Sequence, residues 1–395
     1  MRFSRCPLLL ALLVFAPPAG AADPKVADSL KPFVEKNQLA GAVVLVAGPD
    51  KVLTIETVGF ADRESKVAMQ PNDLFWIASM SKPMTAAALM MLVDEKKVAL
   101  DDPIAKYVPE FKEAWVIAEQ GKDQLLLKRP QRPPTVRDCL RHTSGMPFAT
   151  ALERPTLDRF ALSDGVRGYA ITPLQYEPGT KYAYSNAGIN TAGRIIEIAS
   201  GQSYEDFMAK RLFAPLGMAE TVWRPTAEQQ KRLAKTYKPN KDKTDLEATP
   251  IGQLAYPLDA PSRQPMPAGG LFSTAKDVGA FGQMILRGGT APDGTRLLSE
   301  VAVREMTGTQ TGDLLNKGKG ENGYGLGLST ARKAKPDGPA VAGPCGHGGA
   351  YATNLWIDPD KKLVLVYMVQ HAGFLGDGGK ARGAFEKTAA DIYAK

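Results

Sequence analysis

The chain has 395 residues, of which 44% are hydrophobic and 23% are charged. These fractions are typical of a globular protein, and the length suits one large domain or two ordinary ones. The formal net charge of +7 is scattered, and no basic stripe alternates with aromatic residues, so the sequence gives no support to nucleic-acid binding.

The first residues have the pattern of a secretory signal peptide. Arg2 and Arg5 precede an apolar run at 8–16, and small residues follow it. We therefore predict a signal peptide over 1–22 and a periplasmic or secreted mature protein. The apolar run is too short to span a bilayer and no later run is long enough, so we expect no transmembrane segment.

Cysteines and histidines give little evidence of a structural framework or a metal site. Cys139 and Cys345 remain after removal of the leader, in a compartment that would permit a disulfide. Two cysteines so far apart in sequence form no framework, and their pairing stays open. His142, His347 and His371 lack the spacing of metal ligands, so a zinc site is not expected.

The first third of the mature chain predicts a helix, two strands and a buried helix. An apolar stripe predicts a helix over 23–38. Two β-rich runs, 41–47 and 52–58, are separated by a Gly-Pro-Asp turn, which predicts a hairpin. A helix beginning at Ser79 is apolar nearly all round, so it should be buried.

Ser79 and Lys82 begin this buried helix and are a candidate nucleophile with its base. A spacing of three residues places both side chains on one helix face, and the helix N-terminus favours negative charge. A nearby amine lowers the cost of removing the serine proton. The same spacing recurs at Ser273 and Lys276, where a following capping pattern gives a structural explanation. A capping serine with a solvated lysine is the alternative interpretation of the first pair as well.

The middle of the chain is expected to be mostly helical. It contains a short helix at 135–141 and a longer one that ends at Gly201. Before the longer helix, a turn leads into an extended segment with Tyr184 and Asn186. We expect their side chains to point the same way, because side chains alternate along a strand.

From about residue 260 the pattern returns to turns and strands. Strands are predicted near 324–328 and 340–343, a hairpin over 353–369, and a final helix over 380–395.

Strands at both ends of the chain and helices between them indicate the fold class. We predict an α/β (α+β) fold, in which an antiparallel sheet is flanked by the N- and C-terminal helices. Residues 23–105 and 260–395 would form this α/β domain, and residues 106–259 a mostly helical inserted domain. A cleft is expected where the two domains meet.

Three motifs could converge on that cleft: Ser79-x-x-Lys82, Tyr184-x-Asn186 and His347-Gly348-Gly349. In this order they resemble the motifs of serine β-lactamases and penicillin-binding proteins. The Tyr-x-Asn form is similar to class C β-lactamases, D-alanyl-D-alanine peptidases and family VIII carboxylesterases. Other segments resemble the same family, so the likeness covers nearly the whole mature chain; they are 100–104, 107–109, 140–145, 215–218, 269–275, 324–327 and 346–350.

The resemblance implies a role for each motif residue and a β-lactamase/transpeptidase-like fold. Ser79 becomes acylated, Lys82 accepts or relays its proton, and Tyr184 is the partner base, as a phenolate or through a shared proton. Which of the two is the base stays open, because the pair would titrate together. Asn186 orients Lys82 and binds substrate, and the N–H groups of Ser79 and Ala350 form an oxyanion hole. No metal or organic cofactor is implied.

The third motif departs from the class C pattern, and this affects the expected substrate. His347 stands where those enzymes have a lysine, and a histidine is only partly charged near neutral pH. Gly348 stands where those enzymes have a residue with a hydroxyl group. His347, Gly348, Gly349 and Ala350 are all expected to contact substrate. A weaker anion anchor favours a small ester or a D-amino-acid peptide or amide over a β-lactam. A structural strand residue bonded to backbone is the alternative for His347.

The sequence therefore predicts a secreted or periplasmic serine hydrolase that works through an acyl-enzyme on a small-molecule or peptide substrate. A class C-like β-lactamase is the first alternative, and a non-catalytic penicillin-binding or sensing protein is the second. The oligomeric state stays open.

Overall fold

A computed structural model describes residues 25–315, 322–331 and 343–394. The predicted signal peptide lies outside the described residues. Among the described residues, no helix has the length and hydrophobicity needed to cross a membrane.

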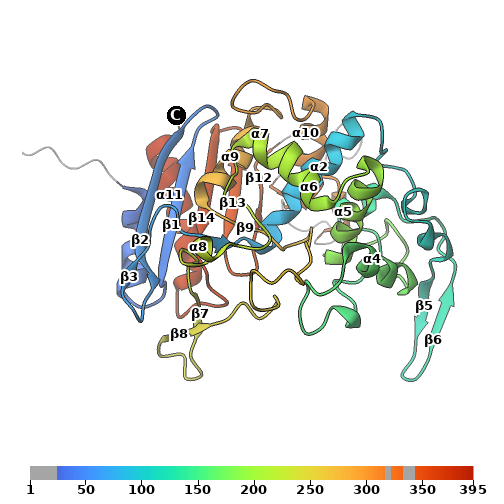
Figure 1. Ribbon diagram of the computed structural model, residues 1–395, viewed down its shortest axis with the longest axis horizontal. Helices are drawn as coiled ribbons and strands as arrows, with labels where there is room; N and C mark the ends of the chain where they lie inside the picture. Colours follow the sequence, from blue (N-terminus) through green and yellow to red (C-terminus); the bar gives the residue numbers. More distant parts are fainter. Residues whose placement is uncertain (1–24, 316–321, 332–342, 395) are drawn as a thin grey trace, which may run out of the picture.

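The architecture is built on an eight-stranded antiparallel sheet, with strand order β10-β11-β12-β13-β14-β1-β2-β3 (Figure 1). Both ends of the chain contribute strands to it. In chain order the strands are β1 Gly41–Ala47, β2 Val52–Asp62, β3 Val67–Ala68, β10 Gly323–Tyr324, β11 Ser329–Thr330, β12 Cys345–Gly348, β13 Asn354–Asp358 and β14 Leu363–Met368.

Strand β1 is buried on both faces because helices cover both sides of the sheet. Its side chains alternate between two hydrophobic cores, with Val43 in one and Val44 in the other. Helix α9 (Ala275–Leu286) packs on the first face, and α11 (Ala381–Tyr393) with the 3-10 helix η1 (Val26–Leu30) covers the second. The predicted fold class, an antiparallel sheet flanked by N- and C-terminal helices, is confirmed.

Several boundaries differ from those predicted. The helix expected over 23–38 is only η1 followed by α1 (Lys31–Glu35), and Asn37 ends the turn at a positive φ of 56°. The extended conformation of β2 continues past residue 58 to Asp62, where it pairs with β3. Most of the strand predicted at 340–343 lies outside the described residues.

Most of the remaining helices lie on the side of the molecule away from β1 and β2 (Figure 1). The elements are α2 Ser81–Asp94, α3 Val136–Leu140, α4 Leu162–Ile171, α5 Asn186–Ser200, α6 Tyr204–Met208, α7 Ala214–Leu216, α8 Ala227–Gln230 and α10 Glu300–Thr307. The middle segment also contains two hairpins that were not predicted from the sequence, β5 (Val116–Gln120) with β6 (Leu125–Lys128) and β7 (Thr236–Pro239) with β8 (Leu246–Thr249). The division into two domains stays a prediction.

Helix α2 lies inside the molecule, between the sheet and the helical part, and packs against α5 and α10. Its residues from Ser81 to Leu92 are all buried, as the sequence predicts for a helix that is apolar all round. The start of α2 is therefore held rigidly, which suits a catalytic group.

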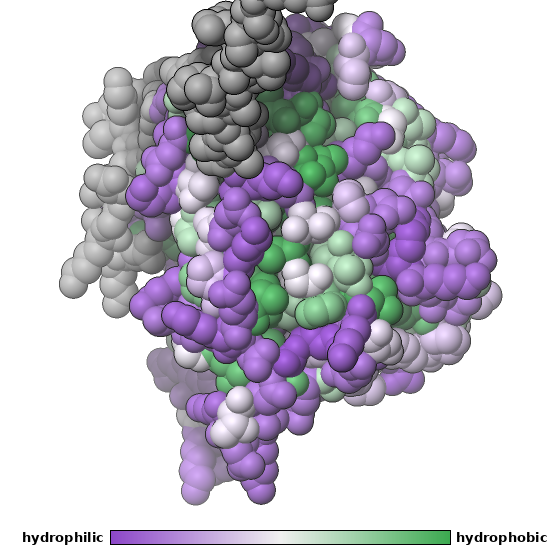
Figure 2. All heavy atoms as spheres, turned by 90° about the vertical axis from the view of Figure 1, so that its left-hand side faces the viewer, coloured by the Kyte–Doolittle hydropathy of each residue, from purple (hydrophilic) through white to green (hydrophobic). Residues whose placement is uncertain are grey.

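The surface at the β2–β3 end of the sheet is mostly hydrophilic, with smaller hydrophobic areas between (Figure 2).

Candidate active site

Ser79 lies in a sharp turn between a short strand and the buried helix α2. Strand β4 (Phe75–Trp76) pairs with β9 (Phe272–Ser273), and the 3-10 turn η2 (Ala78–Met80) follows. Ser79 therefore precedes α2 instead of opening it. Ala78 has a positive φ of 46°, which is costly for a residue other than glycine and is found where surrounding contacts impose it. Two residues before Ala78, the indole N–H of Trp76 donates to the Gly269 carbonyl at 2.8 Å.

The amine of Lys82 is fully buried and has three oxygen neighbours. Its Nζ lies 2.9 Å from Ser79 Oγ, 2.8 Å from Asn186 Oδ1 and 2.6 Å from the Ala268 carbonyl oxygen. The amide and carbonyl oxygens can only accept hydrogen bonds. A neutral amine satisfies both with its two N–H groups and keeps its lone pair for the serine hydroxyl. Burial favours this form, because it lowers the pKa of Lys82 well below its ordinary value.

Tyr184 covers the same pair of residues from the other side. Lys82 Nζ lies 4.7 Å from the centroid of its ring. Burial raises the pKa of Tyr184 above its ordinary value, and a hydrogen bond with Ser79 opposes the increase only in part. The resting tyrosine is therefore a neutral phenol, in contrast to the phenolate that is one of the forms expected from the sequence.

Tyr184 and Asn186 face one cavity, but not for the predicted reason. Their segment is extended at Ser185 (φ −136°, ψ 123°) without pairing as a strand, and Asn186 is the first residue of α5. Ser185 is the N-cap of that helix and accepts from the Gly188 N–H at 3.0 Å. The helix start, not strand alternation, directs Asn186 towards Lys82.

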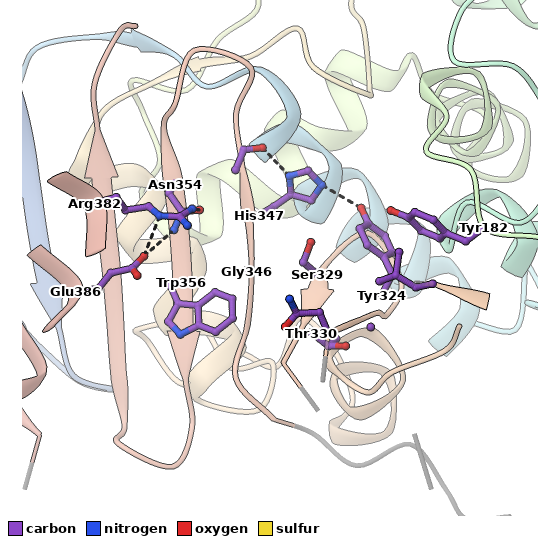
Figure 3. A pocket seen from close by; sticks show the side chains of 14 residues that line it. Tyr182, Tyr324, Ser329, Thr330, Gly346, His347, Asn354, Trp356, Arg382 and Glu386 are labelled. Atoms are coloured by element: carbon purple, nitrogen blue, oxygen red, sulfur yellow. Dashed lines mark hydrogen bonds and ion pairs between the residues drawn. The ribbon is translucent and has the colours of Figure 1, made fainter. Parts of the chain in front are cut away.

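His347 lies on β12 with both ring nitrogens engaged (Figure 3). Nδ1 lies 2.7 Å from the Gly348 carbonyl oxygen, and Nε2 lies 3.0 Å from the Tyr324 hydroxyl and 3.4 Å from the Tyr184 hydroxyl. Burial lowers the pKa of His347 to about 3. The ring is thus neutral at pH 7, and the expected partial charge is wrong. The alternative interpretation of His347, a strand residue bonded to the backbone, fits the contact of Nδ1 but not that of Nε2, which is with a side chain.

The residues after His347 bring the end of β12 against the serine turn. A Cβ on Gly349 would lie 2.1 Å from Thr353 Oγ1 and 2.6 Å from the Ile77 carbonyl oxygen, so only glycine permits this approach. The Gly349 N–H donates to the Thr353 carbonyl at 2.7 Å. As a result Ala350 and Ser79 line the same cavity.

Two cavities lie beside this group of residues. The one that contains Ser79 has a volume of about 300 Å³. Its described lining is Trp76, Ala78, Ser79, Phe148, Leu157, Tyr184, Asn186, Gln253, Met266, Ala268, Gly269, Gly348, Gly349 and Ala350. The second, of about 480 Å³, is lined by His347, Tyr324 and Arg382 among others (Figure 3). Of the eight predicted site residues, six line the first cavity, Lys82 lies buried within hydrogen-bond distance of Ser79, and His347 lines the second.

Four residues that complete the site were not predicted from the sequence. Ala268 supplies an acceptor to Lys82, and Asn190 Oδ1 in turn accepts from the Ala268 N–H at 3.0 Å. His142 and Tyr324 form hydrogen bonds on the far side of Tyr184 and His347. His142 and Tyr324 are far apart in sequence, and no local pattern predicts that they meet.

The structure also bears on the open cysteine pairing and on metal binding. Cys139 and Cys345 are both free and buried, so no disulfide joins them. Within the described ranges, no group of three or more histidine, cysteine, aspartate or glutamate side chains is arranged to hold a metal ion.

A serine beside a buried lysine, at the base of a cavity in this fold, defines a serine hydrolase. Residues 26–389 match the family model described as Beta-lactamase, and the chain belongs to that family. Esterase EstB of Burkholderia gladioli is 28% identical over 356 residues, which cover 82% of this chain and 84% of the esterase. Penicillin-binding protein 4 of Amycolatopsis lactamdurans is 30% identical over 327 residues, covering 83% and 78%.

Solved structures support the fold independently. The structure described as EstCE1, a hydrolase with promiscuous acyltransferase activity, superposes with a TM-score of 0.76 at 22% identity. The match covers 93% of this chain and 97% of that chain.

Proposed function

We propose that the protein hydrolyses small esters through an acyl-enzyme on Ser79. The observation that carries the proposal is the environment of Lys82, whose Nζ is 2.9 Å from Ser79 Oγ and bonded to two groups that can only accept. In the neutral form that burial favours, this arrangement leaves the amine lone pair for the serine proton. It makes Lys82 the base in the resting enzyme and Tyr184, a neutral phenol, the proton donor.

The reaction follows from these protonation states. Ser79 Oγ attacks the ester carbonyl while its proton passes to Lys82, and the carbonyl oxygen takes up negative charge between the N–H groups of Ser79 and Ala350. As the C–O bond to the alcohol breaks, the leaving oxygen takes the phenol proton of Tyr184, and Lys82 returns its proton to Tyr184. Water then attacks the acyl-enzyme, with the same groups moving the protons, and releases the acid.

The lining of the cavity favours neutral substrates with an apolar acyl group. None of its described lining residues carries a charged side chain, and Trp76, Phe148, Leu157 and Met266 present apolar surface. His347 does not supply a cation, because its ring is neutral. A substrate with a carboxylate, such as a β-lactam or a D-alanyl peptide, would find no charged partner in this cavity. The esterase EstB among the relatives is in keeping with this choice.

Two parts of the proposal extend beyond the cavity. Secretion to the periplasm or the medium rests on the leader pattern at 1–22. Hydrolysis of D-amino-acid peptides or β-lactams is the second candidate, and its support is the similarity to penicillin-binding protein 4 and to the family as a whole.

The test is a substrate panel with wild type and Ser79→Ala. We expect wild type to hydrolyse a p-nitrophenyl butyrate ester faster than a chromogenic cephalosporin or a D-alanyl-D-alanine peptide, and Ser79→Ala to lose ester turnover. Ser273→Ala is the matched control, because Ser273 has the same Ser-x-x-Lys spacing but is bonded to Thr221 away from the cavity. Ester turnover that survives in Ser79→Ala would refute the nucleophile. Rapid cephalosporin hydrolysis would favour a β-lactamase, and acylation by penicillin without turnover a sensing protein.

A further inference from the structure

A buried chain of hydrogen bonds runs behind Tyr184 and has a single consistent direction. It begins at the backbone N–H of Ser185, which donates to His142 Nδ1 at 3.1 Å. Because Nδ1 accepts, the neutral ring of His142 carries its proton on Nε2, and Nε2 donates to the Tyr324 hydroxyl at 3.0 Å. Burial keeps this ring neutral, since it lowers the pKa of His142 well below its ordinary value.

The other end of the chain is fixed in the same way. His347 Nδ1 lies 2.7 Å from the Gly348 carbonyl oxygen, which can only accept, so Nδ1 carries the proton of that ring. Nε2 of His347 then has one lone pair in the ring plane. The Tyr324 hydroxyl oxygen already accepts from His142, and its own proton points along the 3.0 Å contact to this lone pair (Figure 3).

Tyr184 competes for the same lone pair from a greater distance. Its hydroxyl lies 3.4 Å from His347 Nε2, at the outer limit of a hydrogen bond, whereas Tyr324 lies at 3.0 Å. A phenol proton given to His347 would be lost to the reaction, since in the proposed mechanism Tyr184 must donate to the leaving oxygen. Occupation of the lone pair by Tyr324 removes that competing acceptor.

We infer that Tyr324 and His142 are positioning residues that direct the Tyr324 proton onto His347 Nε2, and so keep the Tyr184 proton available for the leaving group. This inference rests on the proposed function for its catalytic consequence. The direction of the chain itself is a property of the resting protein. It explains why a histidine at the lysine position of the third motif can work as a neutral group.

The direct test measures the ring tautomers by ¹⁵N NMR in wild-type protein at pH 7. The chain has only three histidines, so the spectrum is simple. We expect His142 protonated on Nε2 and His347 on Nδ1. His371 is the internal reference; its Nε2 accepts from the Ala40 N–H at 3.0 Å, so Nδ1 should carry the proton. A proton on Nδ1 of His142, on Nε2 of His347, or on both nitrogens of either ring would overturn the inference.

The kinetic test is Tyr324→Phe, which removes the hydroxyl and frees His347 to accept from Tyr184. We expect kcat for the butyrate ester to fall about three- to tenfold, the effect of one hydrogen bond, with KM unchanged. Tyr182→Phe is the matched control, because the Tyr182 hydroxyl bonds to no described residue. The rings of Tyr182 and Tyr324 are neighbours, with 5.8 Å between their centroids. Its kcat should stay within twofold of wild type.

The same substitution in a His347→Leu protein separates a positioning role of Tyr324 from a general loss of structure. If Tyr324 acts through His347, Tyr324→Phe should change kcat less than twofold in a His347→Leu protein. An equal fall in both backgrounds would overturn the inference. Should Ser79→Ala keep its activity, the proposed function fails while the tautomer measurement still decides the direction of the chain.

Discussion

Replacing Asn186 by aspartate would place a negative charge beside the buried amine of Lys82. The present Oδ1–Nζ distance is 2.8 Å. With an effective dielectric constant of about 20, two unit charges at that distance attract by about 6 kcal/mol, a ceiling of about four pKa units. Carboxylates this close to a cation shift pKa values by about 1–3 units in proteins, and we expect this range for Lys82.

The sign of the effect follows from the base role of Lys82. A neighbouring carboxylate stabilises the ammonium form, so the pKa of Lys82 rises and the free amine appears only at higher pH. On the ascending limb of the pH profile, ester hydrolysis by Asn186→Asp should therefore fall about tenfold for each unit by which the pKa rises. Part of that activity should return at higher pH, because the alkaline solution deprotonates the amine.

The assay is kcat/KM for p-nitrophenyl butyrate between pH 5 and 10, corrected for spontaneous hydrolysis. The ascending limb of the profile should move upward by 1–3 units in Asn186→Asp. Asn186→Leu is the matched control, since it loses the acceptor without adding charge, and its limb should not move upward. A limb that stays in place or moves downward in Asn186→Asp would refute the argument that a neutral Lys82 is the base.

Three further outcomes follow from the packing. In Lys82→Met, the gain in unfolding free energy relative to wild type should grow as the pH falls from 10 to 7. The reason is that lysine in the unfolded chain takes up a proton in this range, whereas the buried amine of Lys82, with its lowered pKa, does not. Urea unfolding at several pH values measures this difference, and a difference that stays constant with pH would contradict the expectation. Asp158→Ala should lose about 3–5 kcal/mol of unfolding free energy, since it leaves the buried Arg263 unpaired; a loss below about 1 kcal/mol would count against that ion pair. Gly349→Ala should lower kcat/KM for the ester by at least about tenfold, whereas Gly383→Ala, whose Cβ meets nothing within 4 Å, should not.

Local patterns in the sequence predicted much of the fold. The run at 41–47 matches β1 residue for residue, because a strand buried on both faces is continuously apolar. The long helix before Gly201 was also predictable, since that glycine has a φ of 69° at the helix end. The N-terminal helix was predicted too long, because the chain turns at Asn37 to enter the sheet, and nothing in the local apolar pattern encodes that turn.

The site was predictable in its members but not in its protonation. Motif order brought Ser79, Lys82 and Tyr184 together, but the charge of each depends on burial, which only the packed structure defines. The same holds for His347, whose neutrality follows from the packing around it. His142 lies in a turn at a positive φ of 62°, and no periodic pattern predicts its bond to Tyr324.

Strand β1 pairs on one side with β2, its neighbour in sequence, and on the other with β14, where Val43 lies opposite Met368. This pairing closes a loop that includes most of the chain, and such long-range contacts form slowly because the entropy of loop closure opposes them. During synthesis the hairpin of β1 and β2 is complete long before β14, the second neighbour of β1, leaves the ribosome. Until β14 arrives, β1 has an unpaired hydrophobic edge that can bind other chains. The segment that forms β14 thus determines how long the nascent protein is exposed to aggregation.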